Sequence, residues 1–346
     1  MKNGKILVGM SGGLDSTYTV SLLREAGCEV IGAALIFSEH TDIEGARRAA
    51  SELGIPLYER HVESLFKEKV EGNFAFCYQN GMTPNPCVVC NRYVKMQTLY
   101  EMASELGCDG FATGHYATPV RTEEGRYAIA MSSDRKKDQS YMLWGMTQEQ
   151  IAHFTAPLST LEKSEIRERA AAAGLSAAKT KESQDICFIP DGDYVSFLAE
   201  HYGRDKGFSR GRYIDREGKI LGEHQGLVNY TVGQRKGLGI ALGKPAFVTD
   251  MDPEANTVTL SFAENCYFDR ITVEGLVFQA LAPMEGELDC QVKIRYAAPP
   301  VECHVKLTGG RAEVTFQEPQ RTPAPGQSAV FYSDGVIQFG GIIKRG

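Results

Sequence analysis

Short apolar runs alternate with amphipathic stretches through the first third of the chain. The apolar runs predict strands at residues 6–9, 29–37, 55–61 and 110–114. The stretches with helical spacing predict helices at residues 17–26, 43–53, 64–80 and 93–106. This alternation predicts a mostly parallel, doubly wound α/β sheet, which binds its ligand at the carboxyl ends of its strands. Gly9, Leu35 and Gly114 fall at that edge.

The pattern changes beyond the fourth strand. We expect a hairpin strand at residues 127–131 and helices at 138–142, 161–173 and 193–201. From about Gly203 the runs become short and β-branched, with turn signals between them. This predicts two small all-β domains, the second barrel-like. The expected domains are residues 1–202, 203–264 and 265–346.

Composition is ordinary for a globular protein, with 42% hydrophobic and 23% charged residues among 346. No apolar run approaches the roughly 18 residues of a membrane span, and the amino terminus is too short for a signal-peptide core. We therefore expect a cytoplasmic protein with no membrane partner. The nine cysteines, an odd number spread over a long chain, do not resemble a secreted disulfide framework.

The net charge of −7 argues against a strongly basic nucleic-acid binder. It does not exclude a local basic face, for which residues 135–137, 204–219 and 235–236 are candidates. Solvated surface is the more common role of such clusters.

A glycine-rich turn follows the first predicted strand. Gly9-Met-Ser-Gly-Gly-Leu-Asp-Ser16 leads from that strand into a helix, an arrangement that presents backbone N–H groups and a helix N-terminus to phosphate. No lysine follows the glycines, so it is not a GKS/GKT-type P-loop. Ser-Gly-Gly-x-Asp-Ser is the signature of the ATP pyrophosphatase (PP-loop) superfamily. Asp15 is placed to hold a magnesium ion that neutralises a pyrophosphate leaving group; the alternative is a structural turn with a helix cap.

A second candidate site is the proline-rich loop Thr83-Pro-Asn-Pro-Cys-Val-Val-Cys-Asn91. Its prolines favour extended geometry in the residues before them, so the loop should be stiff. Cys-x-x-Cys alone does not distinguish a zinc site, a redox pair and an iron–sulfur cluster.

Several motifs together resemble one family, the tRNA-specific 2-thiouridylases (tRNA-uridine 2-sulfurtransferases). The motifs are SGGLDS, TPNPCVVCN, ATGHY, KDQSYML, ESQDICFI, GLVNYTVGQRKGLGI and PGQSAVFY. They occur in order from Lys5 to the end of the chain. The resemblance implies ATP-dependent 2-thiolation of the wobble uridine of tRNA: O2 is adenylated, pyrophosphate leaves, and sulfur then displaces AMP.

The resemblance also implies which residues bind each substrate. The residues expected to bind ATP, with magnesium, are Gly9, Met10, Ser11, Gly12, Gly13, Leu14, Asp15, Ser16, Leu35 and Gly114. The target uridine, flipped from the anticodon stack, would enter a pocket near Asn85, Pro86 and Cys87. The residues expected to contact tRNA elsewhere are His115, Lys137, Asp138, Gln139, Arg295, Tyr296 and Gln327.

For the sulfur half of the reaction, the resemblance implies that Cys187 carries a persulfide from a donor protein. Cys90 then completes sulfur release, leaving a Cys90–Cys187 disulfide to be reduced. Many family members carry an aspartate where this chain has Cys87. An ordinary thiol, with a pKa of roughly 8.5, could replace that acid only if its pKa were lowered.

Four alternatives remain open. Cys87, Cys90 and Cys187 could hold three irons of a 4Fe–4S cluster, with sulfide as the immediate donor. Zinc would need a fourth ligand, for which His115 is a candidate. An ammonia-using PP-loop synthetase would need neither the three cysteines nor a β tail for RNA. A tRNA-binding or zinc-structured protein without activity would not need an intact SGGLDS loop.

Overall fold

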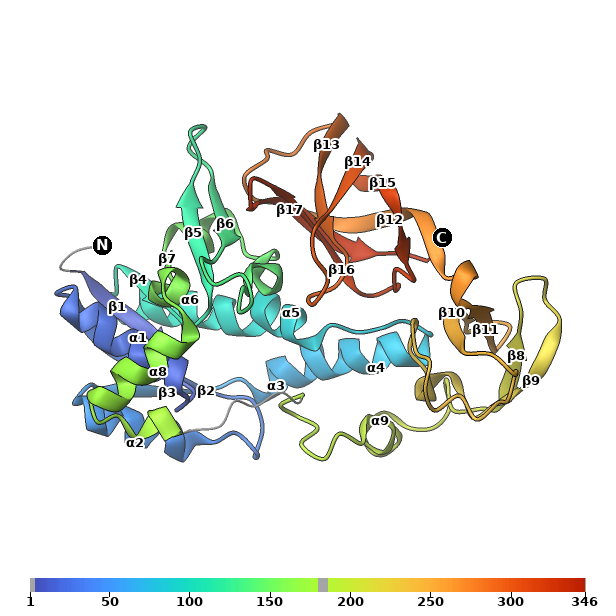
Figure 1. The fold of residues 1–346 in the computed structure, drawn as a ribbon. Helices are drawn as coiled ribbons and strands as arrows, with labels where there is room; N and C mark the ends of the chain where they lie inside the picture. The colour runs from blue at the N-terminus through green and yellow to red at the C-terminus, as the bar shows by residue number, and fades with distance from the viewer. Residues whose placement is uncertain (1–3, 180–185, 346) are drawn as a thin grey trace.

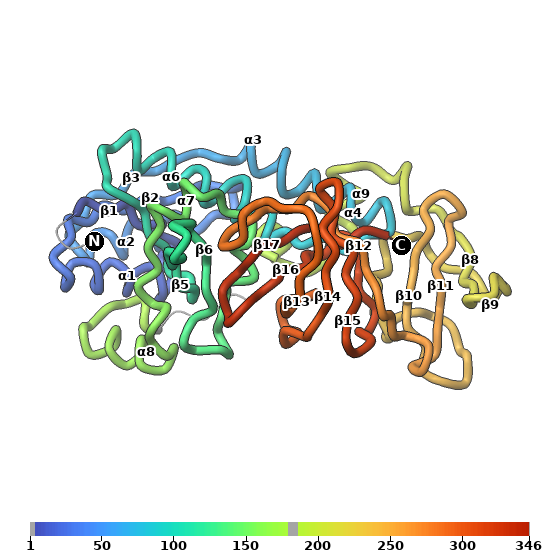
Figure 2. Tube along the Cα trace, turned by 90° about the horizontal axis from the view of Figure 1, so that it is seen from above, coloured from blue at the N-terminus to red at the C-terminus, as the bar shows by residue number. Residues whose placement is uncertain are grey.

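The computed structural model describes residues 4–179 and 186–345. Both views show an elongated molecule, with the amino-terminal α/β part at one end, a β-barrel in the middle and a small sheet at the other end (Figures 1 and 2). Residues 182–185, the first half of the ESQDICFI motif, lie outside the described residues, whereas Cys187 lies within them. In the described ranges, no helix is both long and apolar enough to cross a membrane.

A five-stranded parallel sheet forms the amino-terminal part, in the order β3-β2-β1-β4-β7. Its strands are β1 (Lys5–Gly9), β2 (Glu29–Ile36), β3 (Leu57–His61), β4 (Gly110–Ala112) and β7 (Phe154–Thr155). Alternate side chains of β1 face opposite layers: Ile6 and Val8 pack toward α1 (Leu14–Glu25) and α2 (Ile43–Leu53), whereas Leu7 packs in the core on the other face. The predicted doubly wound sheet is thus confirmed.

Two long helices cover that other face, and each contains one π-helical turn. The first runs through α3 (Glu63–Phe66), a π turn (Lys67–Glu71) and α4 (Gly72–Gln79). The second runs through α5 (Pro86–Cys90), a π turn (Asn91–Lys95) and α6 (Met96–Glu105).

The predicted loop around the cysteine pair is therefore partly wrong, since the helix begins at Pro86 rather than at Tyr93. Asn85 caps it by accepting a hydrogen bond from the Val88 N–H at 3.5 Å, and the fixed φ of proline suits the first helical position. Cys87 and Cys90, three residues apart, lie on one face of this first turn.

Shorter elements complete the α/β part. They are the hairpin β5 (Ala117–Arg121) and β6 (Tyr127–Met131), a 3-10 turn at Ser140–Leu143, α7 (Gln148–Ala152), a 3-10 turn at Pro157–Thr160, α8 (Lys163–Ala172), a 3-10 turn at Ser176–Lys179 and α9 (Tyr194–Tyr202).

The remaining chain is almost entirely β, as predicted. The small sheet has the order β10-β11-β8-β9, formed by β8 (Gly211–Ile214), β9 (Ile220–His224), β10 (Ala246–Asp252) and β11 (Thr257–Phe262). The barrel consists of β12 (Tyr267–Phe278), β13 (Gly286–Lys293), β14 (Val301–Thr308), β15 (Arg311–Arg321), β16 (Ser328–Ser333) and β17 (Val336–Ile343). Pairing of β12 with β17 closes it.

The barrel is tied to the α/β part by pairing and by buried hydrogen bonds. Ala130 of β6 pairs with Val336 of β17, so the hairpin extends the barrel sheet. The Gln279 side chain donates to the carbonyls of Leu143 and Trp144, both at 3.0 Å, and accepts from the Ile129 N–H at 2.9 Å. The exact domain boundaries expected from the sequence stay a prediction.

Candidate active site

The glycine-rich turn is a closed loop held by its own serines. The Ser11 N–H donates to Ser16 Oγ at 3.2 Å, and Ser16 Oγ donates to the Gly13 carbonyl at 3.1 Å. Gly12 has a φ of +75°, and a Cβ there would lie 2.4 Å from the backbone of Gly45 at the start of α2. Glycine is therefore required by both conformation and space, which fixes the loop against α2.

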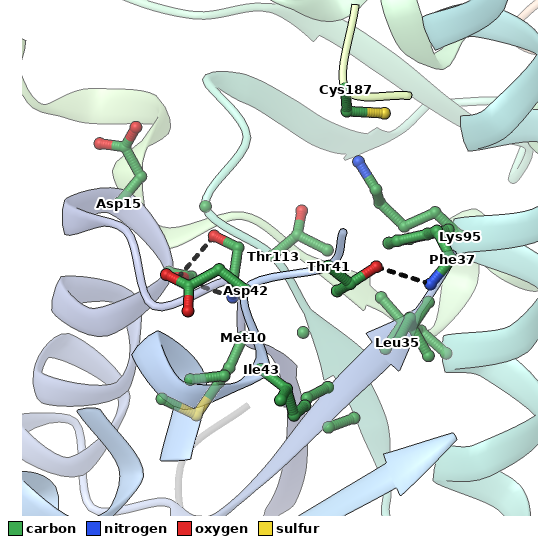
Figure 3. Close-up of a pocket in the computed structure, with 18 of the residues that line it drawn as sticks. Met10, Asp15, Leu35, Phe37, Thr41, Asp42, Ile43, Lys95, Thr113 and Cys187 are labelled. Carbon is green, nitrogen blue, oxygen red and sulfur yellow. Dashed lines mark hydrogen bonds between the residues drawn. The ribbon is translucent and has the colours of Figure 1, made fainter. Parts of the chain in front are cut away.

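A cavity of about 510 Å³ opens at the carboxyl ends of the strands. Seven of the ten residues predicted to bind ATP line it: Gly9, Met10, Ser11, Asp15, Ser16, Leu35 and Gly114. The other three, Gly12, Gly13 and Leu14, belong to the turn and to the first residue of α1 and do not line the cavity. Figure 3 shows Asp15 above the cavity, at the start of α1, and Leu35 and Phe37 on its opposite side.

Asp15 is held by two side chains distant in sequence. Lys163, at the start of α8, donates to both carboxylate oxygens at 2.6 Å. The Tyr116 hydroxyl donates to Oδ1 at 2.8 Å. Sequence reasoning missed this lysine, because a single cation at a helix start carries no signal of a partner 148 residues away. The carboxylate remains partly open to the cavity, with a third of its side chain exposed.

Two residues predicted to contact tRNA lie in this cavity. His115 and Gln139 both line it. His115 Nδ1 is 2.7 Å from Thr113 Oγ1, and burial lowers the pKa of the imidazole to about 3. Gln139 Oε1 accepts from the Tyr116 N–H at 3.1 Å, which orders the residue that holds Asp15.

The three candidate cysteines converge near the cavity but differ in accessibility. Cys187 is exposed and lines the cavity, Cys90 is buried, and Cys87 is exposed. Burial raises the pKa of Cys90 to about 11. Burial and the neighbouring Cys87 also raise the pKa of Cys187. Each thiol thus lies within electrostatic range of the other two.

These thiols do not form a ligand set in the described structure. Among residues 4–179 and 186–345, no group of three or more His, Cys, Asp and Glu side chains is arranged to hold a metal ion. The cluster and the zinc alternatives, the latter with His115, therefore find no metal site in this part of the chain.

A second group of candidate residues gathers where the cysteine helix meets the barrel. The Tyr141 hydroxyl hydrogen-bonds both Asn85 and the Ser328 carbonyl, while burial raises the pKa of this phenol. The pKa of Tyr296 is raised by burial and also by the nearby Cys87. The Tyr141 and Tyr296 ring centroids lie 6.1 Å apart. The aromatic pair thus flanks the start of the cysteine helix.

Basic and amide side chains border this group. Lys293 Nζ lies 5.8 Å from the centre of the Tyr296 ring, and burial lowers the pKa of this ammonium. Gln327 Nε2 donates to the Pro84 carbonyl at 2.8 Å. Arg295 donates to Thr322 Oγ1 at 3.0 Å and to the carbonyls of Arg321 and Thr322. Tyr141 and Lys293 were not among the predicted site residues.

Asp138, predicted to contact tRNA, has a structural role in this conformation. Its buried carboxylate accepts from the Ser132 N–H at 2.9 Å and from Ser140 Oγ at 2.8 Å. The neighbouring Lys137 does not line the cavity. Contacts of either residue with RNA stay a prediction.

Family models match nearly the whole chain. One described as the tRNA methyl transferase HUP domain matches residues 4–191. One described as the tRNA methyl transferase PRC-barrel domain matches residues 196–261, and one described as the aminomethyltransferase beta-barrel domain matches residues 268–343. Among solved structures, the U34-tRNA thiolase NcsA from Methanococcus maripaludis, with its 4Fe–4S cluster, is 19% identical, with a TM-score of 0.36 over 59% of this chain and 69% of that one.

Curated relatives match from end to end. The tRNA-specific 2-thiouridylase MnmA of Lachnoclostridium phytofermentans is 40% identical over 357 residues, covering 99% of both chains. The protein of the same name from Acetivibrio thermocellus is also 40% identical, over 361 residues, covering 99% of this chain and 100% of that one. These matches confirm the resemblance found in the motifs. The chain belongs to the tRNA-specific 2-thiouridylase family and is a tRNA sulfurtransferase that uses ATP.

Proposed function

We propose that this enzyme thiolates the wobble uridine of tRNA in two steps that share one cavity, adenylation of O2 and then sulfur transfer through Cys187 and Cys90. One observation carries the proposal: the phosphate-type loop, with Ser11 and Ser16, and the thiol of Cys187 line the same cavity of about 510 Å³. An intermediate formed beside the loop would not have to leave before sulfur reaches it.

In the first step, uridine O2 attacks the α-phosphate of ATP and pyrophosphate leaves. The turn from Gly9 to Ser16 would cradle the phosphates, and Leu35 and Gly114 would border the nucleotide. Magnesium bound with ATP would neutralise charge on the pyrophosphate, with Asp15 as its protein ligand. The exposed third of the Asp15 side chain leaves room for that role beside Lys163.

The target base would reach the cavity from the side of the barrel. Asn85, Pro86 and Cys87 lie at the start of the cysteine helix, and the ring of Tyr296, which is 38% exposed, would offer a stacking surface to a flipped base. Further tRNA contacts would come from other residues near this entrance and the cavity: His115, Lys137, Asp138, Gln139, Arg295 and Gln327.

In the second step, the terminal sulfur of a Cys187 persulfide attacks C2 of the adenylated uridine and AMP leaves. The Cys90 thiolate then attacks the Cys187 sulfur. This breaks the sulfur–sulfur bond, releases 2-thiouridine and forms a Cys90–Cys187 disulfide, which a thiol reductant resets. A persulfide donor protein would reload Cys187. No step is assigned to an iron–sulfur cluster, because the described cysteines form no metal site.

The proposal is tested with purified enzyme, ATP, unmodified tRNA and a persulfide donor. We expect AMP and pyrophosphate to form only when tRNA is present, and 2-thiouridine to appear in the tRNA on nucleoside mass spectrometry. Pyrophosphate release that needs ammonia and no tRNA would contradict the proposal and indicate a synthetase. Thiolation that requires enzyme-bound iron would contradict the persulfide route.

A further inference from the structure

Lys95 lies between the loop proposed to bind the ATP phosphates and the cysteine proposed to carry the persulfide. It ends the π turn that follows Cys90, so the same continuous helix carries the thiol and the lysine. Its half-buried side chain lines the cavity together with Ser11 and Cys187. Figure 3 shows the Lys95 ammonium directed toward Cys187, across the mouth of the cavity from Asp15. The predicted site residues did not include it.

The two reacting thiols lie in surroundings that disfavour their thiolate forms. Burial raises the pKa of Cys90 to about 11, and the nearby Cys187 and Cys87 act in the same direction. The pKa of Cys187 is raised by burial, Cys87 and Glu71. Because thiolates are the reactive species, both thiols need a compensating positive charge. Lys95 supplies one to each.

The other cations near the cavity do not fit this role. Lys163 places its ammonium 2.6 Å from both oxygens of Asp15. The pKa of His115 is lowered by burial to about 3, so this imidazole is neutral at pH 7. Within residues 4–179 and 186–345, no carboxylate forms a salt bridge with Lys95. Its charge is therefore available to the thiols.

We propose that Lys95 is a positioning residue for sulfur transfer, whose ammonium, directed toward Cys187 at the edge of the ATP cavity, favours the thiolate forms of Cys187 and then Cys90. Each thiol gives its proton to water, and the ammonium balances the negative charge that forms on sulfur. The inference rests on the proposed function only in assuming that these two thiols react during sulfur transfer. The electrostatic interaction of Lys95 with them is a property of the protein without substrates.

The test measures the rate at which iodoacetamide alkylates Cys187 between pH 7 and pH 10, followed by peptide mass spectrometry. Cys108 serves as the reference in the same samples, because its pKa is set by its own burial and by Lys5, Asp109 and Glu29. In Lys95→Met we expect the Cys187 rate at pH 7.5 to fall about tenfold for each unit by which its pKa rises. The Cys108 rate should not change.

Two further variants separate charge from structure. Lys95→Arg keeps the charge and should retain most of the Cys187 rate. Lys69→Met removes an exposed lysine that pairs with Glu68, and should behave as wild type. A Cys187 to Cys108 rate ratio in Lys95→Met equal to that of wild type would overturn the inference. So would an equal loss in Lys95→Arg, because that indicates altered access to the thiol and not the loss of charge.

The assay needs neither ATP nor tRNA, so its failure is distinct from failure of the proposed function. With substrates added, Lys95→Met should form 2-thiouridine more slowly than wild type, and Lys95→Arg should retain most of the wild-type rate. A deficit of the same size in Lys95→Arg would contradict the role of the Lys95 charge in sulfur transfer.

Discussion

At the scale of single residues, the site depends on how each charge is neutralised. Asp15 accepts hydrogen bonds from Lys163 at 2.6 Å and from Tyr116 at 2.8 Å. These partners fix the carboxylate at the first turn of α1, beside the turn that would hold the phosphates. Fixed charges in a partly dry cavity act on substrate without the cost of reorganising water.

Removing the Asp15 carboxylate should abolish adenylation. Asp15→Ala leaves the Lys163 ammonium without its partner and removes the proposed magnesium ligand. We expect tRNA-dependent pyrophosphate release to fall by at least about a hundredfold, as when a preorganised electrostatic group is lost. Glu25→Ala, at the exposed last turn of the same helix, is the matched control and should keep wild-type activity. Normal pyrophosphate release by Asp15→Ala would refute this role.

His115 should make the protein acid-sensitive. Its pKa is about 3 when folded and about 6.5 as the ordinary value. Between these pH values the unfolded chain binds a proton that the folded chain does not, so stability falls as the pH is lowered from about 6.5. The loss is at most about 1.4 kcal/mol per pH unit. The drop in Tm from pH 7 to pH 5 should be smaller in His115→Asn than in wild type. His40→Asn, at an exposed histidine of the same cavity, should not reduce the drop.

At the scale of elements, backbones packed in direct contact set the geometry of the loop. β4 runs into Gly114 directly beneath the start of α1. A Cβ at Gly114 would lie 2.7 Å from the Asp15 carbonyl carbon and 2.8 Å from the Ser16 nitrogen. Backbone atoms cannot move aside as a flexible side chain would, so α1 and the serine-held turn would have to shift.

Gly114→Ala should therefore weaken ATP binding as well as stability. We expect a loss of about 1–3 kcal/mol in stability, as for overpacking elsewhere, and a higher Kd for ATP by calorimetry. Gly72→Ala is the control, since this helical glycine meets only the Lys67 carbonyl at 3.4 Å. It should raise helix stability by up to about 1 kcal/mol. Unchanged ATP affinity in Gly114→Ala would show that the close contact between Gly114 and the start of α1 is not needed for ATP binding.

Periodic elements were predictable from the sequence, and contacts between distant elements were not. The parallel sheet and the all-β second half follow from local patterns, as does the edge where the cavity lies. The start of the cysteine helix at Pro86 was missed, because proline and asparagine signal a loop as readily as a helix cap. Lys163 and Lys95 were missed because their roles depend on contacts in the folded structure, which the position of a single lysine in the sequence does not reveal.

At the scale of the whole molecule, the barrel completes the candidate site. The Gln327 side chain donates to the Pro84 carbonyl at 2.8 Å, and the Thr83 N–H donates to the Pro325 carbonyl at 2.8 Å. Gly340 packs so closely against Trp144 that a Cβ would lie 2.8 Å from the indole. The segment that precedes Cys87 is thus held from the barrel side.

Removing one of these hydrogen bonds between the barrel and the α/β part should slow thiolation more than it weakens ATP binding. Gln327→Ala removes a partly buried hydrogen bond, which should cost about 1 kcal/mol of stability. We expect slower 2-thiouridine formation with an unchanged Kd for ATP. Gln291→Ala, which removes an exposed amide on β13 of the same barrel, is the control. A Gln327→Ala enzyme that thiolates at the wild-type rate would contradict a role for this hydrogen bond in thiolation.

The central claim is that adenylation and sulfur transfer are separate steps in one cavity, and Cys187→Ser separates them. With ATP and tRNA, this variant should still release pyrophosphate, up to about one per tRNA, and form no 2-thiouridine. Cys108→Ser, remote from the site, should complete both steps. The decisive measurement is mass spectrometry of the tRNA from the Cys187→Ser reaction. We predict an AMP adduct on the wobble uridine; 2-thiouridine in that tRNA, or pyrophosphate release abolished in the folded variant, would contradict the account.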